Sequence, residues 1–419
     1  MSRSKLAMFG GDPIRTKPFG IHPVTDFADV QSVLSPFVNH CFSGFRAGQE
    51  EGGPCVQKFE KIMQDLVRSK HSIAFDTWSN GLFAILLALG VRPGDEVILP
   101  AYTMTACASS VLACGAVPVF ADISEKNYCI DHEDIKNKLS PRTKVVMVVH
   151  IFGMPADMDR IKSVVEDYNS NIFIMEDVAQ APLASYKDKY CGMIGDVGGY
   201  SFTESKHVMS CEGGIAVTNN DLISNGLKYV RNHGEVNSLP NCSMPFADNM
   251  IVKDNVGFNF RLTELSAALG CSQLSKLEKE IKTRRSFAKF IDSNLVGIDC
   301  LSTVDVDYDF EHSYYCYTLK WEHESISRNK FSEALAEEGI VFRNGYCQPI
   351  YKQHIYHDYL HWALKDRRKE VNYEDLPMTE EIDSQLLVNL DIRSPNTMED
   401  MEDVVNGIHK VVENLGDLE

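Results

Sequence analysis

The sequence predicts an α/β fold: a mainly parallel sheet of seven strands flanked by helices, followed by a smaller C-terminal α+β domain. From about residue 70, short β-branched runs alternate with helix-length segments, which is typical of βαβ units. The last third of the chain breaks this alternation and mixes strand and helix patterns. The chain of 419 residues is long enough for about two to three domains. We expect an N-terminal arm and large domain over residues 1–290 and a small domain over residues 291–419.

The elements of the large domain follow in order. Seven segments have the composition of strands: residues 72–75, 96–100, 117–120, 144–150, 171–176, 198–202 and 214–218. Helical patterns separate the first five of them, at residues 82–90, 105–115, 130–139 and 158–168. Open sheets of this type bind ligands at the carboxyl ends of their strands. Reactive side chains are therefore expected at those ends.

The remaining elements build the end of the large domain and the small domain. Residues 262–294 show apolar spacing over one long helical stretch, and residues 313–321 have the composition of a strand. A helix is predicted over residues 329–340, ending at Gly339. The final amphipathic helix covers residues 396–415 and is capped by Asn396 or Thr397.

Composition excludes several classes of protein. A formal net charge of -18 argues against a nucleic-acid or anionic-membrane partner, because those are bound through basic surfaces. The twelve cysteines are scattered singly, with no pair or Cys/His cluster at zinc spacing, so we expect reduced thiols and no metal site. The N-terminal stretch MSRSKLAMFGGDPIRTKPF has no apolar core of signal-peptide length, and the longest apolar runs, such as AILLALGV, are too short to span a membrane. We expect a cytoplasmic protein.

Two side chains near strand ends carry the strongest chemical signal. Asp177 ends the strand at 171–176, and Lys206 lies in the stretch SFTESKHVMSCEGG after another strand. Each also has an ordinary interpretation, since aspartate commonly caps a helix and most lysines lie on the surface. With the hydroxyl-rich helix start at residues 78–82, however, they supply what pyridoxal phosphate requires. An acid pairs with the pyridine nitrogen, an amine forms a Schiff base, and a helix N-terminus holds the phosphate.

Ordered motifs extend this pattern along the chain. They are GGDPIRT (10–16), GGPCVQKFE (52–60), WSNGLFAILLALGVRPGDEVILPAYT (78–103), GAVPVFADI (115–123), VHIFGMPADMDRI (149–161), EDVAQAPLASYKDKYCGMIGDVGGYSFTESKHVMSCEGG (176–214), RNHG (231–234) and VGFNFRLTELSAALG (256–270). In this order the sequence resembles the DegT/StrS-type sugar aminotransferases, which are fold-type I pyridoxal phosphate enzymes related to aspartate aminotransferase.

The resemblance implies a role for individual residues. Lys206 is expected to form the Schiff base and to act as the base in turnover, which passes through a pyridoxamine phosphate form. Asp177 is expected to pair with the pyridine nitrogen, and Gln180 to lie beside the phenolic oxygen of the cofactor. The residues implied to bind the phosphate are Ser79, Asn80 and Ser201, with Asn259 or Arg261 reaching it from a neighbouring subunit. A homodimer with shared active sites follows from the last point.

The sequence departs from the family pattern at two positions. Trp78 and Ser79 stand where the family usually has Gly-Thr, so a bulky ring replaces a glycine beside the phosphate. Met104 stands where an aromatic residue usually stacks on the cofactor ring. A thioether can cover a ring face, and Tyr102 is an alternative stacking partner.

Substrate contacts are less specific. His150, Arg231, His233, Arg343 and Tyr351 lie in segments that match the substrate side of the family, although each residue also has a structural interpretation. Arg343 is a candidate for the carboxylate of the amino donor, because arginine binds carboxylates in a bidentate fork.

The sequence thus predicts a pyridoxal phosphate aminotransferase. The amino group is expected to pass from L-glutamate or L-glutamine to a keto sugar, a nucleotide-linked keto sugar or an inosose. Two alternatives remain open at this point, a pyridoxal phosphate sugar dehydratase or other lyase and a non-catalytic cofactor-binding regulator.

Overall fold

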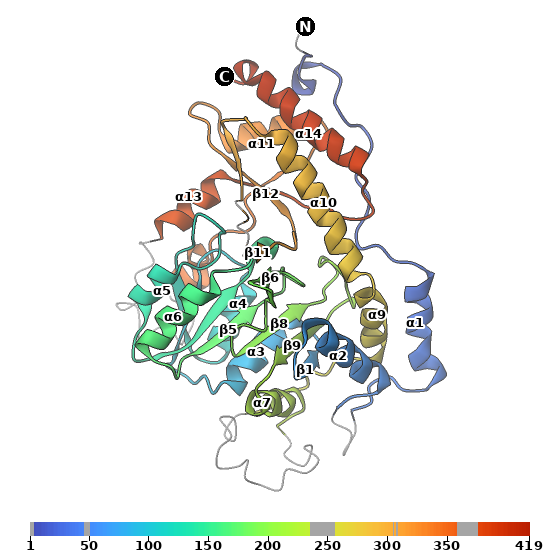
Figure 1. Ribbon diagram of the computed structural model, residues 1–419, viewed down its shortest axis with the longest axis vertical. Helices are drawn as coiled ribbons and strands as arrows, with labels where there is room; N and C mark the ends of the chain where they lie inside the picture. The colour runs from blue at the N-terminus through green and yellow to red at the C-terminus, as the bar shows by residue number, and fades with distance from the viewer. Residues whose placement is uncertain (1–3, 46–50, 235–255, 305, 307–308, 358–375) are drawn as a thin grey trace.

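The computed structural model describes residues 4–45, 51–234, 256–304, 306, 309–357 and 376–419. Figure 1 shows two parts, with the larger sheet and its helices below and a smaller sheet with helices above. Both termini lie in the upper part. The long helix α10 (Leu277–Leu295) runs between the two parts.

The large sheet has seven strands in the order β1-β9-β8-β5-β4-β2-β3. Their bounds are β1 His71–Phe75, β2 Glu96–Pro100, β3 Val117–Ala121, β4 Thr143–Val149, β5 Phe173–Asp177, β8 Val197–Ser201 and β9 Gly214–Thr218. The five strands from β8 to β3 pair in parallel, whereas β9 pairs antiparallel with both β8 and β1. The predicted α/β class and mainly parallel sheet are confirmed, and the predicted strands match to within about two residues at either end.

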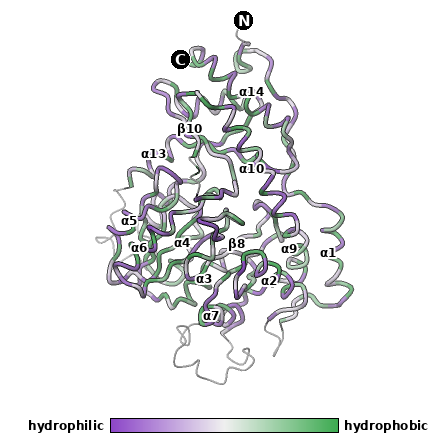
Figure 2. The backbone as a smooth tube through the Cα atoms, viewed as in Figure 1, coloured by the Kyte–Doolittle hydropathy of each residue, from purple (hydrophilic) through white to green (hydrophobic). Residues whose placement is uncertain are grey.

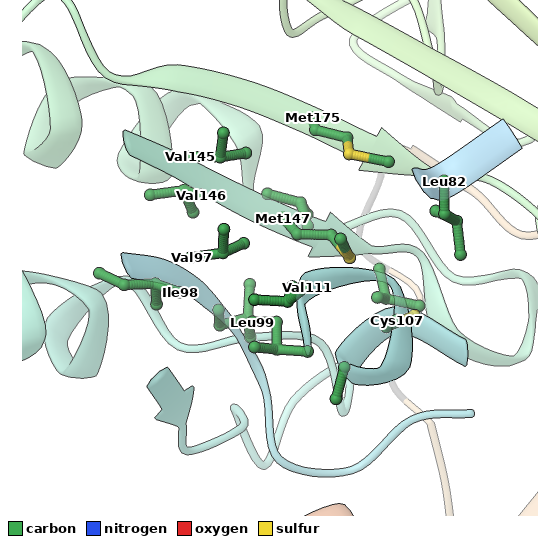
Figure 3. Packing of buried hydrophobic residues seen from close by; sticks show 14 of the residues in the cluster. Leu82, Val97, Ile98, Leu99, Cys107, Val111, Val145, Val146, Met147 and Met175 are labelled. Atoms are coloured by element: carbon green, nitrogen blue, oxygen red, sulfur yellow. The ribbon is translucent and has the colours of Figure 1, made fainter. Parts of the chain in front are cut away.

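Helices flank this sheet. They are α2 Pro54–Val67, α3 Trp78–Ala88, α4 Ala106–Ala113, α5 His132–Lys138, α6 Met158–Tyr168, α7 Asp221–Arg231 and α9 Glu264–Leu274. Apolar side chains of β2, β4 and β5 pack against α3 and α4 (Figure 3), and these strands are buried almost without alternation, as expected for a sheet covered on both faces.

The single long helix predicted over residues 262–294 is wrong. It is two helices, α9 and α10, which part at Ser275 and Lys276. At this break the ammonium of Lys276 lies 2.9 Å from a carboxylate oxygen of Asp26 and 2.5 Å from one of Asp29. Both acids belong to the start of α1 (Phe27–Val38), which packs beside α9 (Figure 1). The chain therefore bends where it is bound to a distant segment.

The smaller sheet is antiparallel, in the order β10-β12-β14-β13. Its strands are β10 Leu301–Thr303, β12 Tyr317–Trp321, β13 Arg343–Asn344 and β14 Leu386–Asn389, and its helices are α11 Arg328–Glu337, α13 Pro377–Gln385 and α14 Met398–Glu413. The short helix α12 His354–His357 instead packs Tyr356 against Phe120 of the large sheet. A third sheet joins β11 Phe310–Glu311, β6 Ser185–Tyr186 and β7 Lys189–Tyr190.

Two predictions for this part are refined. The strand predicted from residue 313 begins only at Tyr317, because the backbone amides of Ser313 and Tyr315 donate to Gly153 and Phe152 of the large part. Thr397, one of two candidates, caps α14 in a capping box with Asp400. The second core contains Leu6 as well as residues of α10 and beyond, and the boundary near residue 290 stays a prediction.

Within the described ranges, no helix is both long enough and apolar enough to cross a membrane.

Candidate functional site

A pocket opens at the carboxyl ends of β4, β5 and β8, beside the first turns of α3 and α4. It encloses about 560 Å³, measured out to its open mouth. Six of the predicted site residues line it: Ser79, Met104, Asp177, Gln180, Ser201 and Lys206. A larger hollow of about 880 Å³ lies at the opposite ends of β4 and β5, beside Lys144 and Phe173, and contains none of the predicted residues. Strand ends, rather than size, therefore identify the candidate site.

Asp177 is buried at the end of β5, and its carboxylate is bound from three directions. Its Oδ1 accepts hydrogen bonds from Nε1 of Trp78 at 2.9 Å and from the backbone amide of Ala179 at 3.0 Å. Its Oδ2 accepts from Sγ of Cys107 at 3.2 Å. The alternative of a helix cap does not apply, because turns and not a helix follow β5.

Lys206 is half-buried and lines the pocket. Its Nζ lies 4.3 Å from the ring centroid of Tyr315, which places the cation over an aromatic face. Within the described part of the chain, no carboxylate forms an ion pair with this amine. The carbonyl of Lys206 accepts from His22 Nε2 at 2.8 Å, which anchors the backbone. The arrangement leaves the amine available for chemistry.

Gln180 lines the same pocket but is held by neighbours outside it. Its Oε1 accepts from the backbone amide of Phe152 at 2.7 Å, and its Nε2 donates to the hydroxyl of Tyr346 at 2.9 Å. Burial raises the pKa of Tyr346 well above its ordinary value, so this phenol stays neutral. The amide is thus fixed in one orientation next to Asp177.

The first turn of α3 supplies a site suited to an anion. Thr77 caps this helix by accepting from the amide of Asn80, and Ser79 is exposed on the pocket wall. Free amides at a helix N-terminus attract negative charge. The side chain of Asn80 instead donates to both oxygens of Asp76, at 2.9 and 3.0 Å, and does not line the pocket. Ser201, at the end of β8, lines the same pocket.

Met104 and Tyr102, the two candidates for covering the cofactor ring, differ in their placement. Met104 lies on the pocket wall with 49% of its surface exposed, as a residue covering a ligand would. Tyr102 is fully buried, and its hydroxyl accepts from the amide of Tyr346 at 2.9 Å. It does not line the pocket, so Met104 is the better placed of the two.

Of the predicted substrate residues, three are engaged elsewhere. His150 is fully buried, with Nε2 2.9 Å from Glu176 and Nδ1 accepting from the amide of Ala156. Arg231 is fully buried and pairs with Glu60 at 2.7 Å. Tyr351 is buried and donates its hydroxyl to Glu380. None of the three lines the pocket.

The other candidates lie outside this pocket as well. His233, Asn259 and Arg343 are exposed, and Arg261 donates to Asn232 at 2.9 Å. A role for Asn259 or Arg261 in a neighbouring subunit stays a prediction, because it concerns a second chain.

Sequence reasoning missed several pocket residues. Cys107, Thr203 and Glu212 line the pocket, and Tyr315 and Tyr346 contact Lys206 and Gln180. Cys107 and Tyr346 come from segments 239 residues apart, so no local pattern joins them. For Cys107, the sequence offered one indication, its place in the first turn of a helix that follows a predicted strand.

Taken together, the pocket fits the predicted cofactor. It combines a buried carboxylate, an amine without a counter-ion, and hydroxyls beside a helix N-terminus. Asp177 would hold the pyridine nitrogen, Lys206 would attach the cofactor, and Ser79 and Ser201 would bind the phosphate.

Comparisons with known proteins point the same way. A model of the DegT/DnrJ/EryC1/StrS aminotransferase family matches residues 38–409. GDP-perosamine synthase of Caulobacter vibrioides is 32% identical over 317 residues, covering 75% of this chain and 81% of that protein. L-glutamine:2-deoxy-scyllo-inosose aminotransferase of Streptomyces kanamyceticus is 30% identical over 346 residues, covering 81% and 79%. The X-ray structure of an aminotransferase from Psychrobacter cryohalolentis matches with a TM-score of 0.83 at 25% identity, covering 95% of this chain and 99% of that one.

Proposed function

The chain belongs to the DegT/DnrJ/EryC1/StrS aminotransferase family, and from this premise we propose that it aminates a keto sugar or cyclitol with pyridoxal 5'-phosphate as its cofactor. The amino donor is L-glutamate or L-glutamine. The observation that carries the proposal is the meeting of Asp177 and Lys206, 29 residues apart in the sequence, in one pocket at the strand ends.

Each pocket residue has a distinct task in this reaction. When bound, the cofactor supplies an electron sink for the bond being changed at the amino-bearing carbon. The carboxylate of Asp177 binds and charges the ring nitrogen, while Ser79, Ser201 and the start of α3 hold the phosphate. The amine of Lys206 accepts a proton at Nζ and returns it. The ring of Tyr315 excludes water from one side of this amine.

The substrates are proposed from the relatives. One relative is named for L-glutamine and an inosose, and another for a GDP-linked sugar, so both a cyclitol and a nucleotide-linked keto sugar fit the proposal. The pocket lining includes Glu212, whose carboxylate can accept hydrogen bonds from sugar hydroxyls. Arg343 remains the candidate for the donor's carboxylate.

A homodimer is part of the proposal. Helix α1 lies at the outer edge of the molecule (Figure 1), and apolar residues recur along it (Figure 2). Phe27, Val30, Leu34, Phe37 and Val38 are each at least half exposed. Such an apolar face on a single helix is typical of a surface that another chain covers. In such a dimer, Asn259 or Arg261 of each copy would reach the phosphate bound by the other.

We also propose a reducing, cytoplasmic location. Eleven cysteines lie in the described residues and all are free thiols, including the exposed Cys211.

A half-reaction assay tests the proposed activity. The purified full chain, loaded with pyridoxal 5'-phosphate, is given L-glutamate or L-glutamine, and the 2-oxo acid released is quantified by chromatography. We expect about one equivalent per active site without an acceptor, and continued release once a suitable keto sugar or inosose is added. Lys206→Ala should abolish release, while Lys282→Ala, at an exposed position on α10, should not change it.

The same assay separates the alternatives. A dehydratase would convert the sugar with loss of water and without an amino product, and a non-catalytic binder would release no 2-oxo acid from either donor. Either result would contradict the proposed amino transfer.

A further inference from the structure

Two side chains that the family pattern does not predict converge on Asp177. Trp78 stands at the first position of α3, and Cys107 lies in the first turn of α4. Their Nε1 and Sγ lie 2.9 and 3.2 Å from the two oxygens of the same carboxylate. Trp78 is 5% exposed and Cys107 is fully buried, so both bonds are shielded from water.

The hydrogen bonds to Asp177 leave one acceptor position of its carboxylate free. A carboxylate has about four lone-pair positions, two on each oxygen. Oδ1 of Asp177 already accepts from Trp78 and from the amide of Ala179, whereas Oδ2 accepts from Cys107 alone among the residues that the structure describes. The remaining acceptor position therefore belongs to Oδ2, and Asp177 lines the pocket.

The indole of Trp78 is held in a slot made by glycines. A Cβ added to Gly199 on β8 would lie 2.0 Å from Cη2 of Trp78, and one added to Gly81 would lie 2.6 Å from its Cε3. A Cβ on Gly214 of β9 would lie 2.7 Å from the Cα of Trp78. Gly199 and Gly81 thus lack side chains where the ring lies, and Gly214 lacks one where the backbone of Trp78 passes. The ring cannot turn away, and its N–H is directed at Asp177.

Cys107 is a fixed donor for a different reason. Burial, and then the charge of Asp177, raise the pKa of its thiol well above the ordinary value. The sulfur therefore keeps its proton and can donate it to Oδ2. Its side chain packs in the core with Leu82 and Met147 (Figure 3), which limits its rotation.

We propose that Trp78 and Cys107 are positioning residues that fix the carboxylate of Asp177 so that the free acceptor position of Oδ2 faces the ring nitrogen of the cofactor. This inference rests on the proposed function, because it concerns the same cofactor. The indole of Trp78, which stands where the family usually has a glycine, thus orients the carboxylate of Asp177.

Four variants test the proposal in the full chain. Trp78→Phe keeps a ring in the glycine slot and removes the N–H, and Cys107→Ala removes the thiol. Cys107→Ser keeps a donor of similar size. Trp321→Phe, at a tryptophan that donates to Ile326 in the small part, is the matched control. For each we would measure the dissociation constant of pyridoxal 5'-phosphate and the pH dependence of the bound cofactor's absorbance.

We expect Trp78→Phe and Cys107→Ala each to weaken cofactor binding about tenfold, as the loss of a hydrogen bond to a charged group does. Both should move the pH profile of the absorbance, which a purely structural role would leave in place. The dissociation constant of Cys107→Ser should stay within about threefold of that of the unmodified chain, and Trp321→Phe should have the same dissociation constant as the unmodified chain.

Unchanged affinity and an unchanged pH profile in both Trp78→Phe and Cys107→Ala would overturn the proposal. Equal losses in Cys107→Ser and Cys107→Ala would also overturn it, because the donor would then be irrelevant. If Trp78→Phe does not fold, the comparison of the two Cys107 variants still decides. Failure of the unmodified chain to bind the cofactor would instead contradict the proposed function, so the two failures are distinguishable.

Discussion

Gly199 gives the clearest link between a single residue and the site. A methyl group there would lie 2.0 Å from Trp78 and 2.5 Å from the carbonyl oxygen of Ile215, so the ring or the strand must move. We expect Gly199→Ala to lower the free energy of unfolding by about 1 to 3 kcal/mol, as overpacking does in a closed core. Chemical denaturation measures this change.

A second glycine provides the control. Nothing lies within 4 Å of a Cβ added to Gly416, near the C-terminus. Gly416→Ala should therefore change the free energy of unfolding by no more than about 0.5 kcal/mol. Equal effects of the two substitutions would show that the slot around Trp78 is not tightly packed.

His312 makes stability depend on pH. Burial, and then the charge of Arg285, lower the pKa of this histidine from 6.5 to about 3. The imidazole in the folded chain therefore stays neutral between pH 6.5 and about pH 4, whereas in the unfolded chain it takes up a proton over this range. The folded state binds fewer protons, so the free energy of unfolding must fall as the pH falls.

The expected contribution is about 2 kcal/mol between pH 7 and pH 5. His312→Asn removes the titrating ring. Between pH 7 and pH 5 this variant should therefore lose about 2 kcal/mol less of its free energy of unfolding than the unmodified chain does. Urea denaturation at pH 8, 7, 6 and 5 gives the pH dependence of the free energy of unfolding for both chains. The difference between the two chains at pH 8, where the histidine is neutral in both states, measures the cost of the substitution that does not depend on protonation. Parallel slopes for the two chains would contradict the assignment to His312.

Helix α1 packs against the rest of the chain on one side and exposes apolar side chains on the other. Its buried side is bound by polar contacts, since Asp29 accepts from Ser272 at 2.7 Å and from Gln273 at 2.9 Å. Its opposite side exposes Leu34 and Phe37, each 54% exposed. A homodimer that buries this side should dissociate when a charge is placed on it.

We therefore expect Leu34→Glu to shift the chain from dimer to monomer by weakening association at least tenfold, because an unpaired charge would be buried in the contact. Sedimentation velocity over a range of concentrations measures the shift. Val296→Glu, at an 83% exposed position after α10, is the matched control and should leave the assembly state unchanged. A monomeric unmodified chain, or a dimer in Leu34→Glu, would contradict a dimer through α1.

Other elements show where local sequence patterns lose their predictive power. Strands of two or three residues, such as β6, β7 and β13, are too short to show a period. The direction of β9 is not encoded in GIAVT either, because a buried apolar run reads alike in both directions. The break between α9 and α10 coincides with contacts from Lys276 to acids about 250 residues earlier, which no local window contains.

For the molecule as a whole, the alternation of strands and helices was enough to predict the sheet and the edge that carries the site. Asp177 and Lys206 could be found because they follow strands whose carboxyl ends meet. Cys107 and Tyr346 could not, since only tertiary folding brings them to Asp177 and Gln180. His150 and Arg231 are a different case, because a polar side chain at the end of a strand or a helix can turn inward, as these two do to pair with Glu176 and Glu60.

The proposed reaction depends on attachment of the cofactor to the amine of Lys206. The most direct measurement is reductive trapping with borohydride on the full chain loaded with pyridoxal 5'-phosphate, followed by proteolysis and mass spectrometry. We predict the mass of the reduced cofactor on the peptide that contains Lys206, and its absence from Lys206→Ala. Stoichiometric label on another lysine, or none in the unmodified chain, would contradict the account.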